Sequence, residues 1–92
     1  MREYEALFII DPAKESSLRE VTDTITGSIK KAKGTITKEE NWGKQKIAHS
    51  IQKNPEGLFY KMEFSIDPSE IKNLRSNYKL NSDILRVMIT TK

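Results

Sequence analysis

The fold of this chain is decided by residues 41–64, which read NWGKQKIAHSIQKNPEGLFYKMEF. Side chains alternate between the two faces over residues 47–51 and again over residues 58–64, and alternation with a period of two predicts half-buried strands. The intervening residues 53–57, KNPEG, have the composition of a turn, in which proline presets one dihedral angle and glycine supplies a positive one. The stretch therefore predicts a long β-hairpin, around which the rest of the chain is arranged.

Residues 1–10 predict a strand that precedes the hairpin. Apolar side chains fall on both of its faces, for example Phe8 on one face and Leu7 on the other. A strand that is apolar on both faces is expected in the middle of a sheet rather than at its edge. The pair Asp11-Pro12 is expected to end it.

The first helix is predicted to follow, because apolar side chains recur at spacings of three and four. Ser17 and Glu20 have the spacing of a capping box, in which each side chain satisfies the other's exposed backbone amide. Gly34 is expected to end the helix, since glycine adopts the left-handed conformation at little cost. The apolar stripe consists of Leu18, Val21, Ile25, Ile29 and Ala32.

The remaining segments complete a sheet. Residues 35–38 predict the start of the second strand, and the polar residues 38–41 predict either a poorly covered strand end or a bulge. Asp67-Pro68 predicts the capped start of a second helix that carries Ile71, Leu74 and Tyr78 on one stripe and ends near Lys79. Residues 81–83 predict a turn and residues 84–91 the last strand, with Leu85 on the same face as Val87 and Ile89.

The order of these elements is strand, helix, strand, strand, helix, strand. With right-handed crossovers, this order predicts an α+β fold, in which a four-stranded antiparallel sheet carries both helices on one face. No internal linker is apparent, so residues 1–92 are expected to form a single domain.

One face of the predicted sheet has no helical layer and is left to solvent or to a partner. Leu7, Ile9, Phe59 and Met88 are expected there, and Trp42 is expected to be structural or, if exposed, interfacial. Scattered surface hydrophobes are ordinary, so an ordinary surface and a docking patch for a protein both remain open. The helix side is expected to carry Tyr4, Ala6, Phe8, Leu58, Tyr60, Met62, Phe64, Val87 and Ile89.

Basic side chains gather at the predicted edges of the sheet. Lys44, Lys46 and Lys53 follow the outgoing arm of the hairpin. The termini and Arg86 would add a second basic group if the first and last strands paired, because Arg2, Arg86 and Lys92 would then be neighbours. Long basic side chains at strand ends can contact phosphates without reading bases, although edge lysines also serve solubility.

Base stacking across the open face is not expected. The common RNA-recognition module has the same element order, but its third strand begins with a basic residue and glycine and presents several rings. Here the corresponding residues 56–64 begin with Glu56 and offer only Phe59 on the open side. A net charge of +3 is compatible with a nucleic-acid partner but does not require one.

Several classes of protein are disfavoured by composition. The chain has 92 residues and no cysteine, so a disulfide framework or a cysteine metal site is excluded, and no apolar run is long enough to span a bilayer. The first ten residues do not read as a signal peptide, and a cytosolic location is expected. His49 is the only histidine and no nucleophile or metal cluster accompanies it, so no catalysis, cofactor or small-molecule substrate is expected.

Four segments of the chain, in order and at the right separations, resemble the protein-six (S-six) family of the bacterial small ribosomal subunit. They are MREYE at residues 1–5, WGKQKIAHSI at residues 42–51, EGLFY at residues 56–60 and ILRVMI at residues 84–89. The resemblance implies a ferredoxin-like fold and a structural role without catalysis. It also implies binding to small-subunit ribosomal RNA, in the central domain that becomes the platform, as a heterodimer with ribosomal protein eighteen.

Candidate contact residues follow from this resemblance together with the edge and open-face patterns. The RNA-binding candidates are Arg2, Lys44, Lys46, Lys53, Arg86 and Lys92. The candidates for the interface with the partner protein are Tyr4, Leu7, Ile9, Trp42, His49, Phe59 and Met88.

Two other functions share the predicted element order. One is a ferredoxin-like module that homo-oligomerises through its open face or senses a ligand, without RNA. The other is an enzyme of the acylphosphatase type, but residues 11–14, DPAK, lack the glycines and arginine of a phosphate loop. A stable homodimer that ignores RNA would favour the first of these two.

Overall fold

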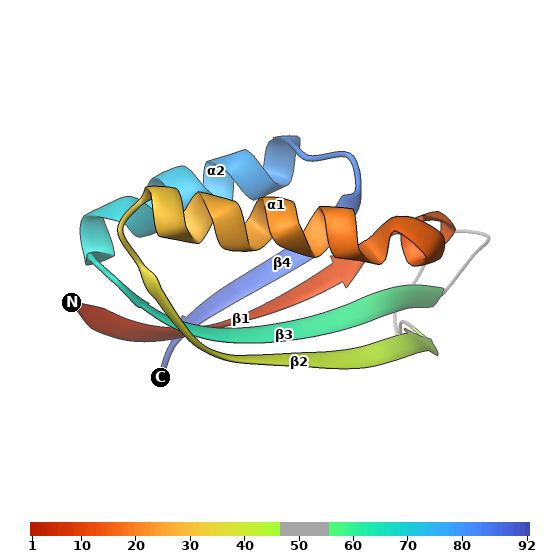
Figure 1. Cartoon of the computed structure of the whole chain (residues 1–92), viewed down its shortest axis with the longest axis horizontal. Helices are drawn as coiled ribbons and strands as arrows, with labels where there is room; N and C mark the ends of the chain where they lie inside the picture. Colours follow the sequence, from red (N-terminus) through yellow and green to blue (C-terminus); the bar gives the residue numbers. More distant parts are fainter. Residues whose placement is uncertain (47–55) are drawn as a thin grey trace.

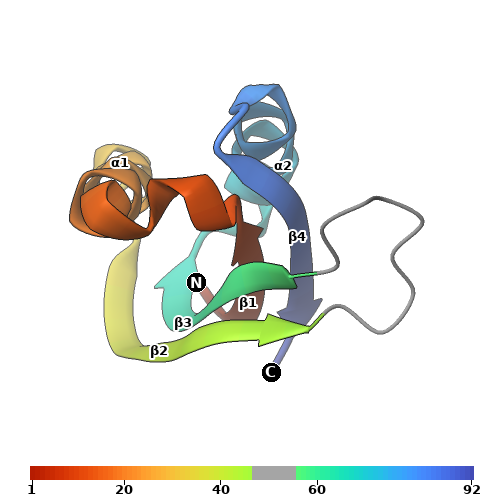
Figure 2. The same cartoon turned by 90° about the vertical axis from the view of Figure 1, so that its right-hand side faces the viewer.

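The computed structural model describes residues 1–46 and 56–92, which form a four-stranded antiparallel sheet with helices on one face (Figures 1 and 2). The strands are β1 (Arg2–Ile10), β2 (Thr35–Lys46), β3 (Glu56–Ile66) and β4 (Ile84–Thr91). The helices are α1 (Leu18–Lys31) and α2 (Ile71–Leu80), each entered through a short 3₁₀ helix, η1 (Pro12–Ser17) and η2 (Pro68–Glu70).

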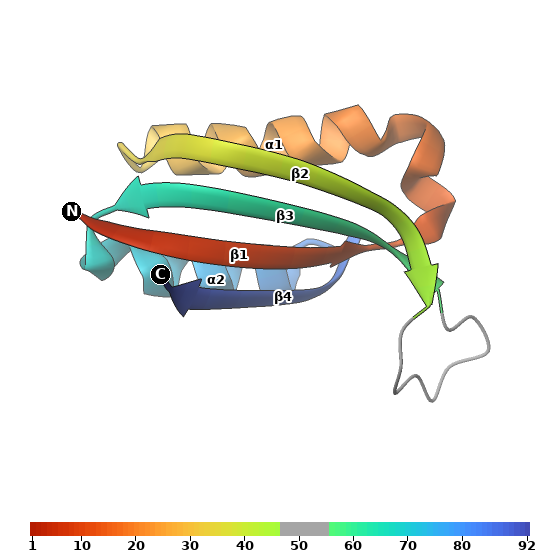
Figure 3. The same cartoon turned by 90° about the horizontal axis from the view of Figure 1, so that it is seen from below.

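The strand order is β2-β3-β1-β4, so β1 lies inside the sheet, as its two apolar faces predicted. This order, with both helices on one face, confirms the predicted ferredoxin-like α+β fold. Figure 3 looks at the opposite face of the sheet, which no helix or strand of the described residues covers. The bare face is therefore a direct consequence of having a single helical layer.

The core lies between the helices and the sheet and follows the predicted alternation. Ala6 and Phe8 of β1 are fully buried there, and burying a large apolar side chain contributes about 1.5–3 kcal/mol. The ring of Phe8 meets Tyr78 of α2 edge-on, with 5.1 Å between ring centroids. Tyr78 also joins the two helices, because its hydroxyl lies 2.8 Å from the Ser28 hydroxyl of α1.

The helix starts differ from expectation in one respect. Asp67 caps the second helical segment as predicted, accepting a hydrogen bond from the Ser69 N–H at 3.0 Å. The prediction of a capping box at Ser17 and Glu20 is wrong, because the Ser17 side chain makes no capping hydrogen bond. The chain is already coiled in η1 when α1 begins, and the cap has moved to Asp11.

The end of α1 corrects the role given to Gly34. Lys33, with φ of 64°, adopts the left-handed conformation, and the N–H groups of Lys33 and Gly34 donate to the carbonyls of Lys30 and Ile29. Gly34 is needed for space instead, since a Cβ there would lie 2.8 Å from Cγ2 of Ile29. The left-handed residue at the end of the helix therefore lies one position before the glycine that was expected there.

Two strand details also differ. Gly57 lies within β3, opposite Gln45, rather than in a turn, and Glu56 is the first residue of the same strand. The remaining residues of the predicted turn, 53–55, lie outside the described residues. In β4 a register shift opposite Ile9 and Ile10 brings Ile84 into the core and leaves Leu85 45% exposed. The extra residue reverses the expected facing of Leu85.

Candidate protein and RNA interfaces

The bare face of the sheet carries a hollow of about 230 Å³. All four strands contribute to its lining, which consists of Glu5, Leu7, Trp42, Lys61, Met88 and Thr90. Trp42 and Met88 are 43% and 39% exposed. Contiguous apolar side chains left in water commonly mark interaction sites, so this hollow is the part of the face best suited to receive a partner's side chain.

A β-bulge brings Trp42 to the hollow. Asn41 pairs with Tyr60 and Gly43 pairs with the next residue, Phe59, so Trp42 is an extra residue in β2. Gly43 has φ of 76°, and its N–H donates to Oδ1 of Asn41 at 2.9 Å. Since bulges redirect side chains and this one requires a left-handed residue, the Trp42-Gly43 pair is a structural unit that presents the indole.

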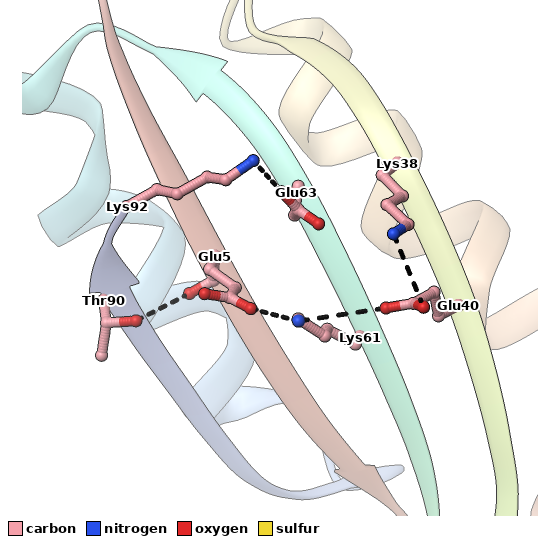
Figure 4. A network of polar contacts seen from close by, with 7 residues as sticks. All are labelled: Glu5, Lys38, Glu40, Lys61, Glu63, Thr90 and Lys92. Atoms are coloured by element: carbon pink, nitrogen blue, oxygen red, sulfur yellow. Dashed lines mark hydrogen bonds and ion pairs between the residues drawn. The ribbon is translucent and has the colours of Figure 1, made fainter.

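Opposite charges alternate across the strands beside the hollow (Figure 4). Lys61 of β3 forms an ion pair with Glu5 of β1 and lies 3.9 Å from Glu40 of β2. Lys38 lies 3.7 Å from the same Glu40 carboxylate. Lys61 also lies 5.9 Å from the centre of the Trp42 ring, within the range of a cation–π contact.

A further ion pair lies on the same face of the sheet. Lys92 reaches across β1 to the carboxylate of Glu63 on β3 (Figure 4). The hydrogen bond from Lys92 lowers the pKa of Glu63, and the same bond raises the pKa of Lys92. The pKa of Lys61 is likewise raised by its hydrogen bond to Glu5. These pairs leave the network with equal numbers of lysines and glutamates, so it carries no net charge.

The structure brings only some of the predicted partner-interface residues together. Leu7, Trp42 and Met88 meet at the hollow, and the half-buried Phe59 lies on the same face beyond the bulge. His49 lies outside the described residues.

Two predicted partner-interface residues are not available at the surface. Tyr4 is 6% exposed and faces the core, where it stacks on Phe64 with 6.0 Å between ring centroids. Ile9 belongs to the open face by register but is only 4% exposed, with Phe59 and Arg86 as cross-strand neighbours. Placing these two at a contact surface is therefore wrong, because alternation specifies a face but not exposure.

The predicted RNA-binding residues are dispersed. Arg2, Lys46 and Arg86 are exposed on three different strands, and Lys44 lies 4.0 Å from Glu15 of η1. Lys53 lies outside the described residues.

The expected group of Arg2, Arg86 and Lys92 does not form. The antiparallel register of β1 and β4 places Arg86 opposite Ile9. Lys92 lies at the other end of the pair, where its N–H donates to the carbonyl of Glu3 at 3.1 Å. Six residues of strand separate Arg86 from Lys92, about 20 Å at strand rise, so Arg86 is remote from the other two.

The hollow itself was not predicted as a site. By simple alternation Glu5 shares a face with Leu7, Lys61 with Phe59, and Thr90 with Met88. What alternation could not provide was the position of Trp42, because the bulge changes the phase of β2. The signal in the sequence was Gly43 itself, because a glycine in the interior of a strand often marks a bulge.

Neither a membrane span nor a metal centre is found in the described residues. No helix among residues 1–46 and 56–92 is long and apolar enough to cross a bilayer. Within the same residues, no three His, Asp or Glu side chains come together as metal ligands would.

A model of the family described as ribosomal protein S6 matches residues 3–91. The chain belongs to the ribosomal protein S6 family. As a member of this family it is a structural protein of the small ribosomal subunit and not an enzyme, and its place is the bacterial ribosome in the cytoplasm.

Curated relatives of the S6 family cover nearly the whole chain. Small ribosomal subunit protein bS6 of Porphyromonas gingivalis is 34% identical over 89 residues, which are 96% of this chain and 76% of the relative. The bS6 protein of Clostridium botulinum is also 34% identical, over 99% of this chain and 98% of the relative.

Solved structures agree with the fold. The crystal structure of 30S ribosomal protein S6 from Thermotoga maritima superposes with a TM-score of 0.89 at 30% identity, covering 99% of this chain and 87% of that one. The C-terminal domain of the MgtC protein from Mycobacterium tuberculosis superposes with a TM-score of 0.65 at 13% identity, a likeness of fold alone.

Proposed function

We propose that this chain binds small-subunit ribosomal RNA, in the central domain that becomes the platform, as a heterodimer with ribosomal protein eighteen of the same subunit. Membership of the S6 family supports a ribosomal role. The sequence resemblance described above is the basis for naming the RNA region and the protein partner.

The observation that carries the protein half of this proposal is the hollow around Leu7, Trp42 and Met88. Its apolar lining lies beside a network in which Lys61 and Lys92 are held by glutamates. A phosphate backbone is attracted by uncompensated cations, and this face has few to offer. An apolar side chain of a protein suits it better, since aromatic residues and methionine are enriched at protein interfaces.

The RNA half of the proposal rests on shared binding. A domain of this size supplies few phosphate contacts, and each of them is weakened by salt. A partner docked on the open face would add its own contacts and hold both sets in one orientation, so the pair binds RNA more tightly than either protein. Arg2, Lys44, Lys46 and Arg86 are the described candidates from this chain.

The test compares this chain, protein eighteen and their mixture on a central-domain RNA fragment, over a series of salt concentrations. The mixture is expected to bind much more tightly than either protein, with an affinity that falls steeply as salt rises. A fragment from another region of the same RNA serves as control. Trp42 is the only tryptophan, so its fluorescence reports heterodimer formation separately.

Two outcomes would contradict the proposal. One is tight binding of RNA by the isolated chain that does not respond to salt. The other is a stable homodimer with no gain in RNA affinity on adding protein eighteen, which would instead support an oligomerising module without RNA.

A further inference from the structure

The basic side chains of this protein divide into two groups by their surroundings. Five lysines lie within 4.0 Å of a carboxylate, whereas Arg2, Lys46 and Arg86 on the sheet and Arg19 of α1 have no such neighbour among the described residues; the five are Lys14, Lys38, Lys44, Lys61 and Lys92. No such neighbour is found among the described residues for the cations of the helical layer beyond the middle of α1; they are Lys30, Lys31, Lys33, Lys72, Arg75 and Lys79. Residues 47–55 contain no Asp or Glu that could change this division.

Helix α2 arranges three of the uncompensated cations in a row. Lys72, Arg75 and Lys79 recur at spacings of three and four, which place them on one side of a helix. All three are exposed, on the flank of the helix about 100° around from the buried stripe of Ile71, Leu74 and Tyr78. At 1.5 Å per residue, the row extends over about 10 Å along the helix axis.

No carboxylate interrupts this row. The ten residues of α2 include no Asp or Glu, and Glu70 precedes the helix. A helix surface that serves only solubility usually mixes both signs of charge. This exposed flank of α2 therefore concentrates positive charge that nothing in the described part of the chain neutralises.

The groove between the two helices lies along the other flank of α2 and is polar rather than purely basic. Lys31 of α1 lines this groove together with Glu70 and the amide side chains of Asn73 and Asn77, around a volume of about 240 Å³. Figure 2 shows the two helices side by side on the side of the sheet away from the open face. Amide and ammonium groups both donate hydrogen bonds to phosphate oxygens.

We propose that the exposed flank of α2 that carries Lys72, Arg75 and Lys79 contacts the phosphate backbone of RNA. This inference rests on the proposed function and extends it, because it assigns RNA to the helical layer and leaves the open sheet face to the protein partner. The chain then lies between the two, with protein on one side and RNA on the other. Contacts of this kind would hold the RNA without reading its sequence.

The experiment uses the double variant K72Q/K79Q in the heterodimer on central-domain RNA. Arg75 is kept, because its Nη2 donates to the carbonyl of Ile89 at 3.3 Å and helps to fix α2 on β4. Loss of two phosphate contacts should lower the slope of log affinity against log salt by about 1.4 to 1.8, and affinity at 0.1 M salt by about tenfold or more.

The matched control is K14Q/K38Q, which removes the same charge from two ion-paired lysines outside the hollow. It should change the slope much less. Equal changes in both variants would overturn the inference, since net charge rather than position would then explain the effect. An unchanged K72Q/K79Q slope would overturn it as well.

Heterodimer formation and circular dichroism are measured on the same samples. If K72Q/K79Q weakens the heterodimer instead of RNA binding, α2 contacts protein and the inference is wrong. If the wild-type heterodimer shows no salt-dependent RNA binding, the proposed function itself fails, which is distinct from failure of this inference.

Discussion

The two sides of this protein handle charge in opposite ways. On the open sheet face, lysines and glutamates from neighbouring strands pair across the sheet, as Lys61 does with Glu5 and Glu40. On the helical layer, the exposed cations of α2 have no ion-pair partner among the described residues. The difference follows from geometry. A sheet places side chains of different strands directly opposite one another, so opposite charges can pair. Along α2, the charged side chains that are neighbours at spacings of three and four are all cations.

The same contrast applies to apolar side chains. The open face leaves Trp42 and Met88 around a hollow beside neutral ion pairs. The helical layer turns its apolar stripes inward and leaves mainly polar groups outside, apart from Leu80 at the end of α2. One side therefore suits an apolar protein surface, and the other suits a polyanion.

The largest effect is expected from Trp42→Ala on the heterodimer. Truncating an exposed indole at the centre of a protein interface should cost about 2 kcal/mol or more of binding free energy, roughly a thirtyfold loss of affinity. The thermal stability of the isolated chain should change little, because the side chain is 43% exposed before binding. Titration calorimetry measures the first quantity and thermal unfolding the second.

Leu80→Ala is the control for that variant. Leu80 is 85% exposed and belongs to the helical layer, so its truncation should leave the heterodimer unchanged. If the two variants weakened the heterodimer equally, the open face would have no special role in protein binding.

The same substitution at two glycines should have effects of opposite sign on the two sides. At Gly43, with φ of 76°, alanine must adopt a left-handed conformation, which should destabilise the protein by about 1–2 kcal/mol. At Gly27 in α1, alanine meets nothing within 4 Å and should stabilise it by about 1 kcal/mol.

Urea unfolding of both glycine variants measures these changes. Gly43→Ala should also weaken the heterodimer, because the bulge that presents Trp42 is disturbed. A Gly43→Ala protein of undiminished stability would show that the bulge does not require a left-handed residue.

A smaller effect is expected from Ser28→Ala, which removes the hydroxyl bound to Tyr78 at 2.8 Å. Burial raises the pKa of Tyr78, and its hydroxyl would lose this partner, at a cost of about 1 kcal/mol in the free energy of unfolding. Thr90→Val on the open face removes only a long contact of 3.5 Å to the Glu5 carbonyl and should cost less. Equal losses would mean that the Ser28–Tyr78 bond does not hold the helices together.

The smallest effect concerns pH. Because Lys92 lowers the pKa of Glu63 in the folded protein, this carboxylate contributes stability at pH values above its unfolded pKa. That contribution is lost as the pH falls through the lowered pKa. In Lys92→Gln the pKa of Glu63 should move back up and the acid-dependent loss should shrink. Carboxyl NMR titration checks the first change and unfolding as a function of pH the second.

Lys79→Gln is the matched control for the pH prediction, since Lys79 belongs to the uncompensated group on α2. It should leave the pKa of Glu63 in place. A shift of similar size in both variants would mean that overall charge, rather than the ion pair, sets this pKa.

Local pattern predicted most of the fold. Each pattern depends on a single element that turns one side to the core, so it could be interpreted without knowing the neighbouring elements. Examples are the stripe of Val21, Ile25 and Ile29 and the alternation along β1. Alternation failed where one extra residue changed a phase, since it assigned no face to Trp42 in β2 and put Leu85 of β4 on the wrong face. A bulge reverses the facing of every residue beyond it, and its position depends on the partner strand.

Charge groups were the least predictable feature. Arg2, Arg86 and Lys92 were expected together, yet the register of β1 and β4 separates Arg86 and gives Lys92 a partner in Glu63. The row on α2 could have been found from sequence, because Lys72, Arg75 and Lys79 have helical spacing and no acidic neighbour within the helix.

By itself, the sequence determined the order of the elements, the side of each that faces the core, and membership of a family whose residues match from end to end. These properties depend on spacing along the chain, which is present before folding. Only the tertiary structure decided that Trp42 joins Leu7 and Met88, and which lysines are neutralised. The reason is that both depend on cross-strand register, which is set by the packing of the whole sheet and by its bulges.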